Sequence, residues 1–139
     1  MKLSTRSRYG VRLMYELALR HGGGPVILKD IAHTQEISEK YLSKLIIPLK
    51  VAKLVRASRG SHGGYNLTRD PSEISIREIV EVLEGDLTTV ECVHDESACT
   101  RSPDCPVRDL WHGLDRSVLN FLESIKLSDV AKKSIRKKT

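Results

Sequence analysis

The sequence predicts a mainly α-helical fold with one small β-hairpin, and three observations support this prediction. Apolar residues recur at spacings of three and four in several segments, as they do along one face of a helix. Two short extended runs surround a glycine-rich segment near the middle of the chain, which is the pattern of a hairpin. The 139 residues, 40% hydrophobic and 29% charged, suffice for one domain with a hydrophobic core.

The N-terminal segment is expected to form a helix over residues 3–19. Ser4 or Thr5 can cap its start, because a hydroxyl oxygen there accepts a hydrogen bond from an unpaired backbone N–H. The run of glycines and proline at residues 22–25 ends the helical pattern.

A helix-turn-helix pattern follows. A short helix is expected over residues 28–33, a turn around residues 35–37, and a second helix after the N-cap Ser38. Pro48 lies inside this second helix, where it removes a backbone donor and crowds the carbonyl group near Lys44. The helix is therefore expected to kink or to end early there.

The glycine-rich segment at residues 59–64 is predicted to be the tip of a hairpin with strands at residues 54–58 and 65–67. A hairpin after a helix-turn-helix is a wing. Ser75 and Glu78 then form a capping box, which opens another short helix that Gly85 stops.

The C-terminal part begins with a cysteine loop at residues 91–106. A long last helix is expected over residues 107–127, with a broad apolar face that its own core or a second subunit must bury. The basic tail, residues 132–139, is expected to fray. The predicted architecture is one structural domain with three regions: a winged helix-turn-helix region (1–90), the cysteine-rich loop (91–106), and a dimerisation helix with its tail (107–139).

Charge is divided unevenly along the chain, although the net charge is only +5. Residues 1–60 carry 12 Lys or Arg against 4 Asp or Glu, whereas residues 61–104 carry 3 against 10. A basic surface attracts polyanions such as DNA, and a merely solvated basic face is the alternative. No apolar run approaches the roughly 20 residues that span a bilayer, and no signal peptide is evident. A cytoplasmic protein with no membrane partner is therefore expected.

Polar side chains opposite the apolar stripe of the second helix are suited to contact DNA. Lysines reach phosphates or guanine edges, and serines contact either. Tyr41 either belongs to the core or contacts a phosphate. An arginine on a glycine-flanked tip fits the minor groove, and N-terminal basic residues, including Arg12, would add phosphate contacts. The predicted DNA-binding residues are Ser38, Lys40, Tyr41, Ser43, Lys44, Arg59, Gly60, Lys2, Arg6 and Arg8.

The only cysteines of the chain are Cys92, Cys99 and Cys105, with six and five residues between them. An odd number of cysteines argues against a disulfide framework. Thiolates bind iron in clusters and also zinc, and the spacing alone does not separate the two metals. Redox-active thiols without a metal remain an alternative.

Four motifs together resemble the Rrf2 family of bacterial winged-helix regulators, of the IscR and NsrR type. They are LSTRSRYGVR (3–12), KDIA (29–32), SEKYL (38–42) and RGSHGGY (59–65), and the cysteines fall where cluster-binding members carry theirs. The resemblance implies a homodimer that reads a palindromic operator in double-stranded DNA. It also implies an iron–sulfur cluster, either 2Fe–2S or 4Fe–4S, on the three cysteines, with zinc less favoured.

The fourth cluster ligand departs from the family pattern. Some members place a histidine three residues after the last cysteine, where this chain has Arg108. Others use a carboxylate near position 8 of the partner subunit, where this chain has Arg8. The remaining candidate ligands in the sequence are His94, His112, Asp104 and His33.

The hypothesis from sequence is a DNA-binding transcriptional repressor whose operator affinity is controlled by a cluster that senses redox state, iron or nitric oxide. The alternative is a cluster-free winged-helix regulator that responds through thiol oxidation or a protein partner. An enzyme is not expected, because Cys92 and His94 are the one close thiol–imidazole pair and nothing else resembles a catalytic site.

Overall fold

The computed structural model describes the backbone of residues 2–138 and the side chains as far as Lys133. Most of this part is helical, and its one sheet is a two-stranded hairpin. In chain order the helices and strands are α1 (Thr5–Leu19), α2 (Leu28–Gln35), α3 (Glu39–Val51), β1 (Val55–Ser58), β2 (Gly64–Leu67), α4 (Ile76–Glu84), α5 (Arg108–Ser124) and α6 (Leu127–Lys138). The predicted winged helix-turn-helix is confirmed.

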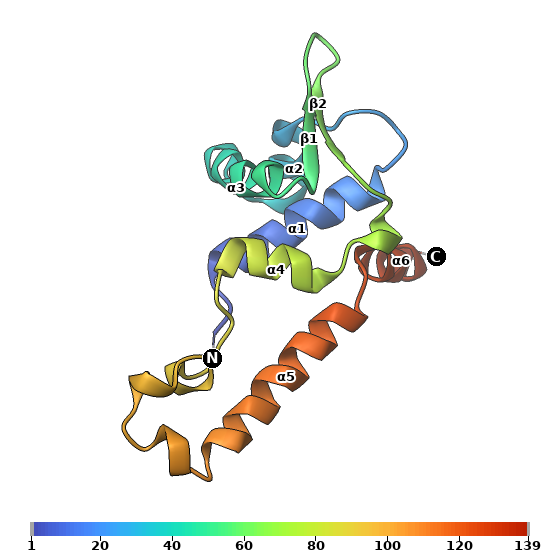
Figure 1. The fold of residues 1–139 in the computed structure, drawn as a ribbon. Coiled ribbons are helices and arrows are strands. Elements are labelled where there is room, and N and C mark those ends of the chain that lie inside the picture. Colours follow the sequence, from blue (N-terminus) through green and yellow to red (C-terminus); the bar gives the residue numbers. More distant parts are fainter. Residues whose placement is uncertain (1, 139) are drawn as a thin grey trace.

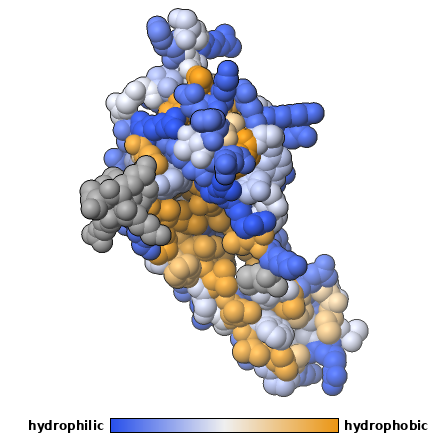
Figure 2. Space-filling view, turned by 180° about the vertical axis from the view of Figure 1, so that it is seen from behind, coloured by the Kyte–Doolittle hydropathy of each residue, from blue (hydrophilic) through white to orange (hydrophobic). Residues whose placement is uncertain are grey.

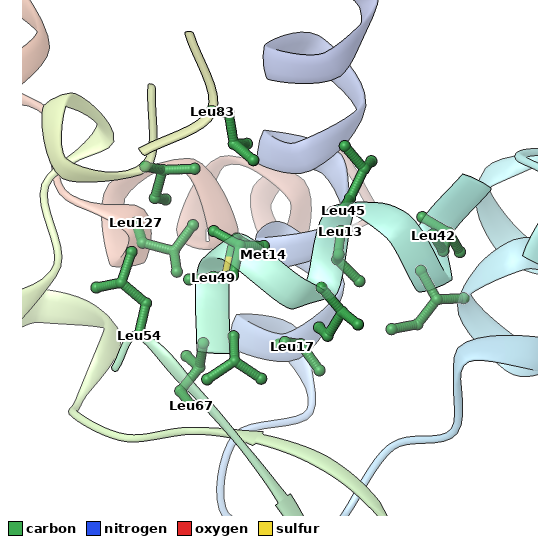
Figure 3. Packing of buried hydrophobic residues seen from close by; sticks show 14 of the residues in the cluster. Leu13, Met14, Leu17, Leu42, Leu45, Leu49, Leu54, Leu67, Leu83 and Leu127 are labelled. Carbon is green, nitrogen blue, oxygen red and sulfur yellow. The ribbon is translucent and has the colours of Figure 1, made fainter. Parts of the chain in front are cut away.

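Helix α1 runs through the centre of the body, with α3, α4 and α6 around it (Figure 1). Leu13, Met14 and Leu17 on one of its faces are buried and meet leucines from the surrounding elements (Figure 3). Gly10 allows α4 to approach, because a Cβ atom at this position would lie 2.0 Å from Leu83 Cδ1. The core therefore fixes α1 against the helix-turn-helix on one side and the C-terminal elements on the other.

The helix-turn-helix forms as its sequence predicts. Helix α2 ends at Glu36, whose φ of 54° turns the chain into the left-handed region. The Ser38 hydroxyl oxygen accepts a hydrogen bond from Tyr41 N–H at 3.0 Å and caps α3. Helix α3 continues through Pro48 to Val51, so the expected early end is wrong. Leu49 beyond the proline is fully buried, and this burial offsets the proline's cost of about 3 kcal/mol.

The wing is an antiparallel pair in which Val55 faces Leu67 and Ser58 faces Gly64. Val26 adds a bridge to the hairpin, because it exchanges two backbone hydrogen bonds with Tyr65, of 2.9 and 2.8 Å. Gly64 is required at this bridge, since a Cβ atom there would lie 2.6 Å from Val26 O. The hairpin is thus held at its base by the buried Val55 and Leu67 and along β2 by Val26, and its tip projects from the body (Figure 1).

Helix α4 begins with the predicted capping box. Glu78 N–H donates to Ser75 Oγ at 3.1 Å, and Ser75 N–H donates back to Glu78 Oε2 at 3.0 Å. Gly85 ends the helix with a φ of 82°. The chain then enters the cysteine loop, which contains three short 3-10 turns (Glu91–Val93, Glu96–Ala98 and Ser102–Asp104) rather than a longer helix.

The C-terminal region differs from the single helix expected over residues 107–127. Helix α5 stops at Ser124, and the next two residues are extended before α6 begins. This break pairs with the segment before α4: Ile76 N–H donates to Ile125 O at 2.9 Å, and Leu127 N–H donates to Ile74 O at 2.8 Å. The tail expected to fray is helical to Lys138, and Thr139 lies outside the described residues.

Helix α5 projects from the body and carries the cysteine loop at its far end (Figure 1). We call the loop and α5 together, residues 91–124, the arm. Apolar surface continues from the body onto the arm (Figure 2). Leu110, Leu114 and Phe121 are 61%, 41% and 64% exposed, and they share one helical stripe. No helix within residues 2–138 is both long and apolar enough to cross a membrane.

Candidate DNA interface and cysteine loop

The predicted reading face lies on α3. Lys40 and Lys44 are exposed and one helical turn apart, opposite the buried stripe of Leu42, Leu45 and Leu49. Ser38 and Ser43 are also exposed, but both already have partners within the helix. Ser38 is the N-cap, and the Ser43 hydroxyl donates to Glu39 O at 3.0 Å. The Ser43 donor is therefore already used within the helix, whereas the lysine ammonium groups and the Ser38 O–H remain able to donate to DNA.

Tyr41 is half-buried and packs edge-on against Tyr9, with ring centroids 5.8 Å apart and the planes at 89°. This placement fits the expected core role, with the ring at the edge of the core. Arg59 and Gly60 lie exposed at the wing tip, where Gly60 adopts a φ of 106°. The tip and the exposed face of α3 are therefore the candidate parts for contacts in the DNA grooves.

Basic residues of the N-terminal segment separate into two groups. Lys2, Arg6 and Arg8 are exposed, and they remain available for phosphate contacts. Arg12 differs from the expected phosphate contact, because its guanidinium donates to the side chain and backbone of Gln35. Sequence periodicity places Arg12 on α1 but gives no sign of a partner 23 residues away.

The three cysteines are free thiols in the arm. Cys92 and Cys105 are half-buried, whereas Cys99 is exposed. Within residues 2–138, no three His, Cys, Asp or Glu side chains gather closely enough to hold a metal ion. The thiols fit an iron–sulfur cluster by their chemistry but not by their present positions. The loop must rearrange before the three thiols can act as one ligand set.

Arg108 occupies the position at which the family resemblance would place a histidine ligand. Its Nε donates to Cys92 O at 2.7 Å, and its Nη1 donates to Glu96 Oε1 at 2.8 Å. The arginine is 19% exposed and Glu96 is 62% exposed, so the contact with Cys92 is the better shielded of the two. Arg108 thus links the start of α5 to the first turn of the loop.

The other candidate ligands have separate surroundings. His94 lies at 3.5 Å from Asp86, at an exposed site, and is not part of a ligand group. His33 is on α2 in the body, while His112 is on α5. Asp104 belongs to the last 3-10 turn of the loop. The structure therefore does not bring any of them together with two cysteines into a metal-sized group among the residues it describes.

Acidic side chains stabilise the turns on either side of Cys92. Hydrogen bonds from Thr88, first from its hydroxyl and then from its backbone N–H, lower the pKa of Asp86. The same two kinds of bond from Ser97 lower the pKa of Asp95. These carboxylates are used as turn caps, which reduces their availability as metal ligands.

The arm also contains a buried carboxylate that sequence reasoning missed. Asp115 on α5 is 8% exposed and accepts the Thr89 N–H at 3.1 Å. It therefore holds the segment before the cysteine loop against α5. An aspartate among the apolar residues of an amphipathic helix was the signal available in the sequence, since a buried carboxylate needs a partner.

Comparison with known proteins identifies the chain. Residues 3–133 match the Rrf2 family model, described as "Iron-dependent Transcriptional regulator". The transcriptional regulator CymR of Bacillus subtilis is 43% identical over 131 residues, covering 94% of this chain and 90% of CymR.

Two solved structures are similar over nearly their whole length. CymR, described as the global cysteine regulator of B. subtilis, superposes with a TM-score of 0.81 at 41% identity, covering 96% of this chain and 98% of CymR. The IscR of T. potens superposes with a TM-score of 0.82 at 37% identity, covering 100% of this chain and 92% of IscR. These relatives are named as regulators and not as enzymes. The chain therefore belongs to the Rrf2 family of transcriptional regulators.

Proposed function

We propose that this regulator is a homodimer that binds a palindromic operator in double-stranded DNA and acts as a repressor in the cytoplasm. The observation that carries the proposal is the separation of two surfaces: exposed lysines and Arg59 lie at one end of the molecule, and an exposed apolar stripe lies along α5. The first surface suits the phosphates and base edges of DNA. The second needs a partner to cover it.

A second copy of the chain is the partner that this stripe supports. Leu110, Leu114 and Phe121 are apolar, adjacent along one helix face and more than two-fifths exposed in the single subunit. An isologous helix pair would bury the same side chains of both copies. Two copies would present two α3 helices, and a two-fold arrangement matches the symmetry of a palindromic site.

We propose that Cys92, Cys99 and Cys105 control operator affinity by binding an iron–sulfur cluster. The support is the donor chemistry of three thiols in one loop, the family description as iron-dependent, and the similarity to IscR. A bound cluster would join the three cysteines and so restrain the loop that carries them. Because the thiols do not form a metal-sized group in this structure, the loop would have to rearrange to bind a cluster, and Arg108 contacts the first turn of this loop.

The alternative proposal is control by thiol oxidation or by a protein partner, without a cluster. Two observations favour it: the three thiols are not gathered among the described residues, and CymR is described as a cysteine regulator. Zinc on the same cysteines is the third possibility, and it is distinguished by metal analysis.

The test is iron, acid-labile sulfide and zinc content of protein purified without oxygen, followed by DNA binding. The probe is a duplex that the wild-type protein selects from a random library, with a mixed-sequence duplex as control. Iron and sulfide in equal amounts, with affinity that changes when they are removed, support the cluster proposal. Metal-free protein whose affinity changes with a thiol oxidant supports the alternative. Absence of any preference for a selected duplex contradicts operator binding itself.

A further inference from the structure

We propose that Arg12 is a positioning residue that fixes the orientation of the recognition helix α3, rather than a contact to DNA phosphate. The inference rests on the proposed DNA binding, but the contacts that carry it lie within the protein. They form a chain from Glu16 through Gln35 and Arg12 to Tyr9 and Tyr41.

Arg12 first closes the end of α2. Gln35 is the last residue of this helix, and its backbone carbonyl is one of the four that a helix leaves without an internal partner. The Arg12 guanidinium donates to this carbonyl, and its Nε donates to Gln35 Oε1 at 2.8 Å. A cation at a helix C-terminus is also favoured by the helix dipole. One side chain of α1 therefore holds both the backbone carbonyl and the side-chain oxygen of Gln35.

Glu16 completes the attachment one turn further along α1. Its carboxylate is only 4% exposed, accepts a hydrogen bond from Gln35 Nε2, and lies 3.3 Å from the Arg20 guanidinium. A buried carboxylate is costly without such partners. The Gln35 amide can satisfy both neighbours in one orientation, with its oxygen towards Arg12 and its nitrogen towards Glu16. The end of α2 is thus fixed in both position and rotation.

Tyr9 extends the same network to α3. The Arg12 guanidinium lies 5.1 Å from the centroid of the Tyr9 ring, and that ring contacts Tyr41 edge-on. Tyr41 lies in the first turn of α3, between the exposed Lys40 and the buried Leu42. Arg12 therefore contacts the end of α2 directly and the start of α3 through one aromatic ring.

The network lies beside the short turn between α2 and α3, so it can control the orientation of α3. Only residues 36–38 separate α2 from α3, and Glu36 among them is left-handed. A small rotation at the end of α2 would therefore move the reading face of α3, and misplaced side chains lose base-edge contacts before they lose phosphate contacts. Loss of Arg12 should reduce discrimination between operator and other DNA more than it reduces general attraction to DNA.

The dependence of DNA affinity on salt separates positioning from phosphate contact. Each phosphate contact contributes about 0.9 to the slope of log affinity against log salt concentration. We would compare wild type with Arg12→Gln, Arg12→Lys and Glu16→Gln on the selected duplex and on mixed-sequence DNA. Arg8→Gln is the matched control, because Arg8 is exposed on the same helix.

For all three network variants we expect the operator preference to fall by about tenfold, the size of one lost base-pair contact, with the salt slope on mixed-sequence DNA unchanged. Arg8→Gln should instead lower the slope and keep the preference. A slope lowered by about 0.9 in Arg12→Gln, which loses the charge, but not in Arg12→Lys, which keeps it, would identify a phosphate contact and overturn the proposal. An unchanged preference in all three variants would overturn it as well.

A measurement without DNA keeps the inference separate from the proposed function. Ile37 N–H donates to Ala32 O at 3.1 Å, within the turn that Arg12 holds. Hydrogen exchange of this amide should accelerate in Arg12→Lys and Glu16→Gln, but not in Arg8→Gln. Unchanged exchange at the turn would overturn the positioning role even if the wild-type protein binds its operator. Failure of the wild type to bind any DNA selectively, with accelerated exchange in the variants, would overturn the proposed function and the DNA consequence drawn here.

Discussion

Arg108 holds Cys92 by its backbone and not by its thiol. The guanidinium Nε donates to the Cys92 carbonyl oxygen at 2.7 Å across 16 residues of chain. The first cysteine of the loop is therefore fixed relative to α5, while Cys99 lies exposed in the middle of the loop. Arg108 therefore determines how freely the first turn of the loop can move relative to α5.

Replacing Arg108 with Gln should expose Cys92. Hydrogen bonds from a charged donor contribute about 1.5–3 kcal/mol, and losing part of this would make local opening of the first turn about fivefold more frequent. Alkylation of Cys92, followed by mass spectrometry of the apo protein, should accelerate accordingly. Cys99 is the internal control, because it is already exposed and its rate should not change. Equal rates at Cys92 in the two proteins would contradict the role given to Arg108.

A charge on the apolar stripe of α5 should prevent dimerisation. In Phe121→Glu a carboxylate would be buried without a partner, which should raise the dimer dissociation constant by about a hundredfold or more. Analytical ultracentrifugation measures this directly. Asn120→Glu places the same charge on the same helix, at an exposed position off the stripe, and should leave the dimer intact. Dimers of Phe121→Glu with wild-type affinity would mean that another surface joins the subunits.

The capping box of α4 predicts a defined loss of stability. Ser75→Ala removes the side-chain acceptor of Glu78 N–H, and N-cap replacements of this kind cost about 1 kcal/mol in the free energy of unfolding. Urea unfolding monitored by circular dichroism measures the difference. Ser61→Ala, at an exposed position of the wing tip, is a suitable comparison and should be nearly neutral.

Acid should loosen the segment before the cysteine loop. Hydrogen bonds from Thr88 lower the pKa of Asp86 below its ordinary value of 3.8 in the folded chain. The stabilisation this gives is fully present above pH 3.8 and is lost as the pH falls through the lowered pKa. Asp86→Asn should reduce the change in the free energy of unfolding as the pH falls below about 5, because the variant lacks the carboxylate that takes up a proton on unfolding. An identical pH profile for the variant would show that Asp86 is not linked to folding.

Local chemistry was sufficient to predict much of the body of the molecule. Ser38 and Ser75 cap the helices that their hydroxyls predicted, and the glycine-rich tip lies between two paired strands. Each of these features depends on residues within a few positions of one another. The exposed lysines of α3 could be assigned to one face for the same reason, because their spacing of four residues is a local property of the helix.

Features that depend on distant partners were not predictable in this way. The break after Ser124 is stabilised by backbone hydrogen bonds with Ile74 and Ile76, about 50 residues earlier in the chain. The role of Arg12 depends on Gln35, and the role of Asp115 depends on Thr89. The early end of α3 at Pro48 was wrongly expected for the same reason, since the burial of Leu49 is decided by the tertiary core.

The pairing of Ile125 with Ile76 has a consequence for how such proteins can diversify. The chain leaves the body at the C-terminal end of α4 and returns to it at the N-terminal side of the same helix, where Ile125 pairs with Ile76, so the two ends of α4 anchor the two ends of the excursion. Everything between the anchors can lengthen, shorten or change its chemistry while the anchors keep their positions. Natural variation of the input signal is therefore expected to proceed by replacement of this whole segment, with the DNA-reading body inherited unchanged.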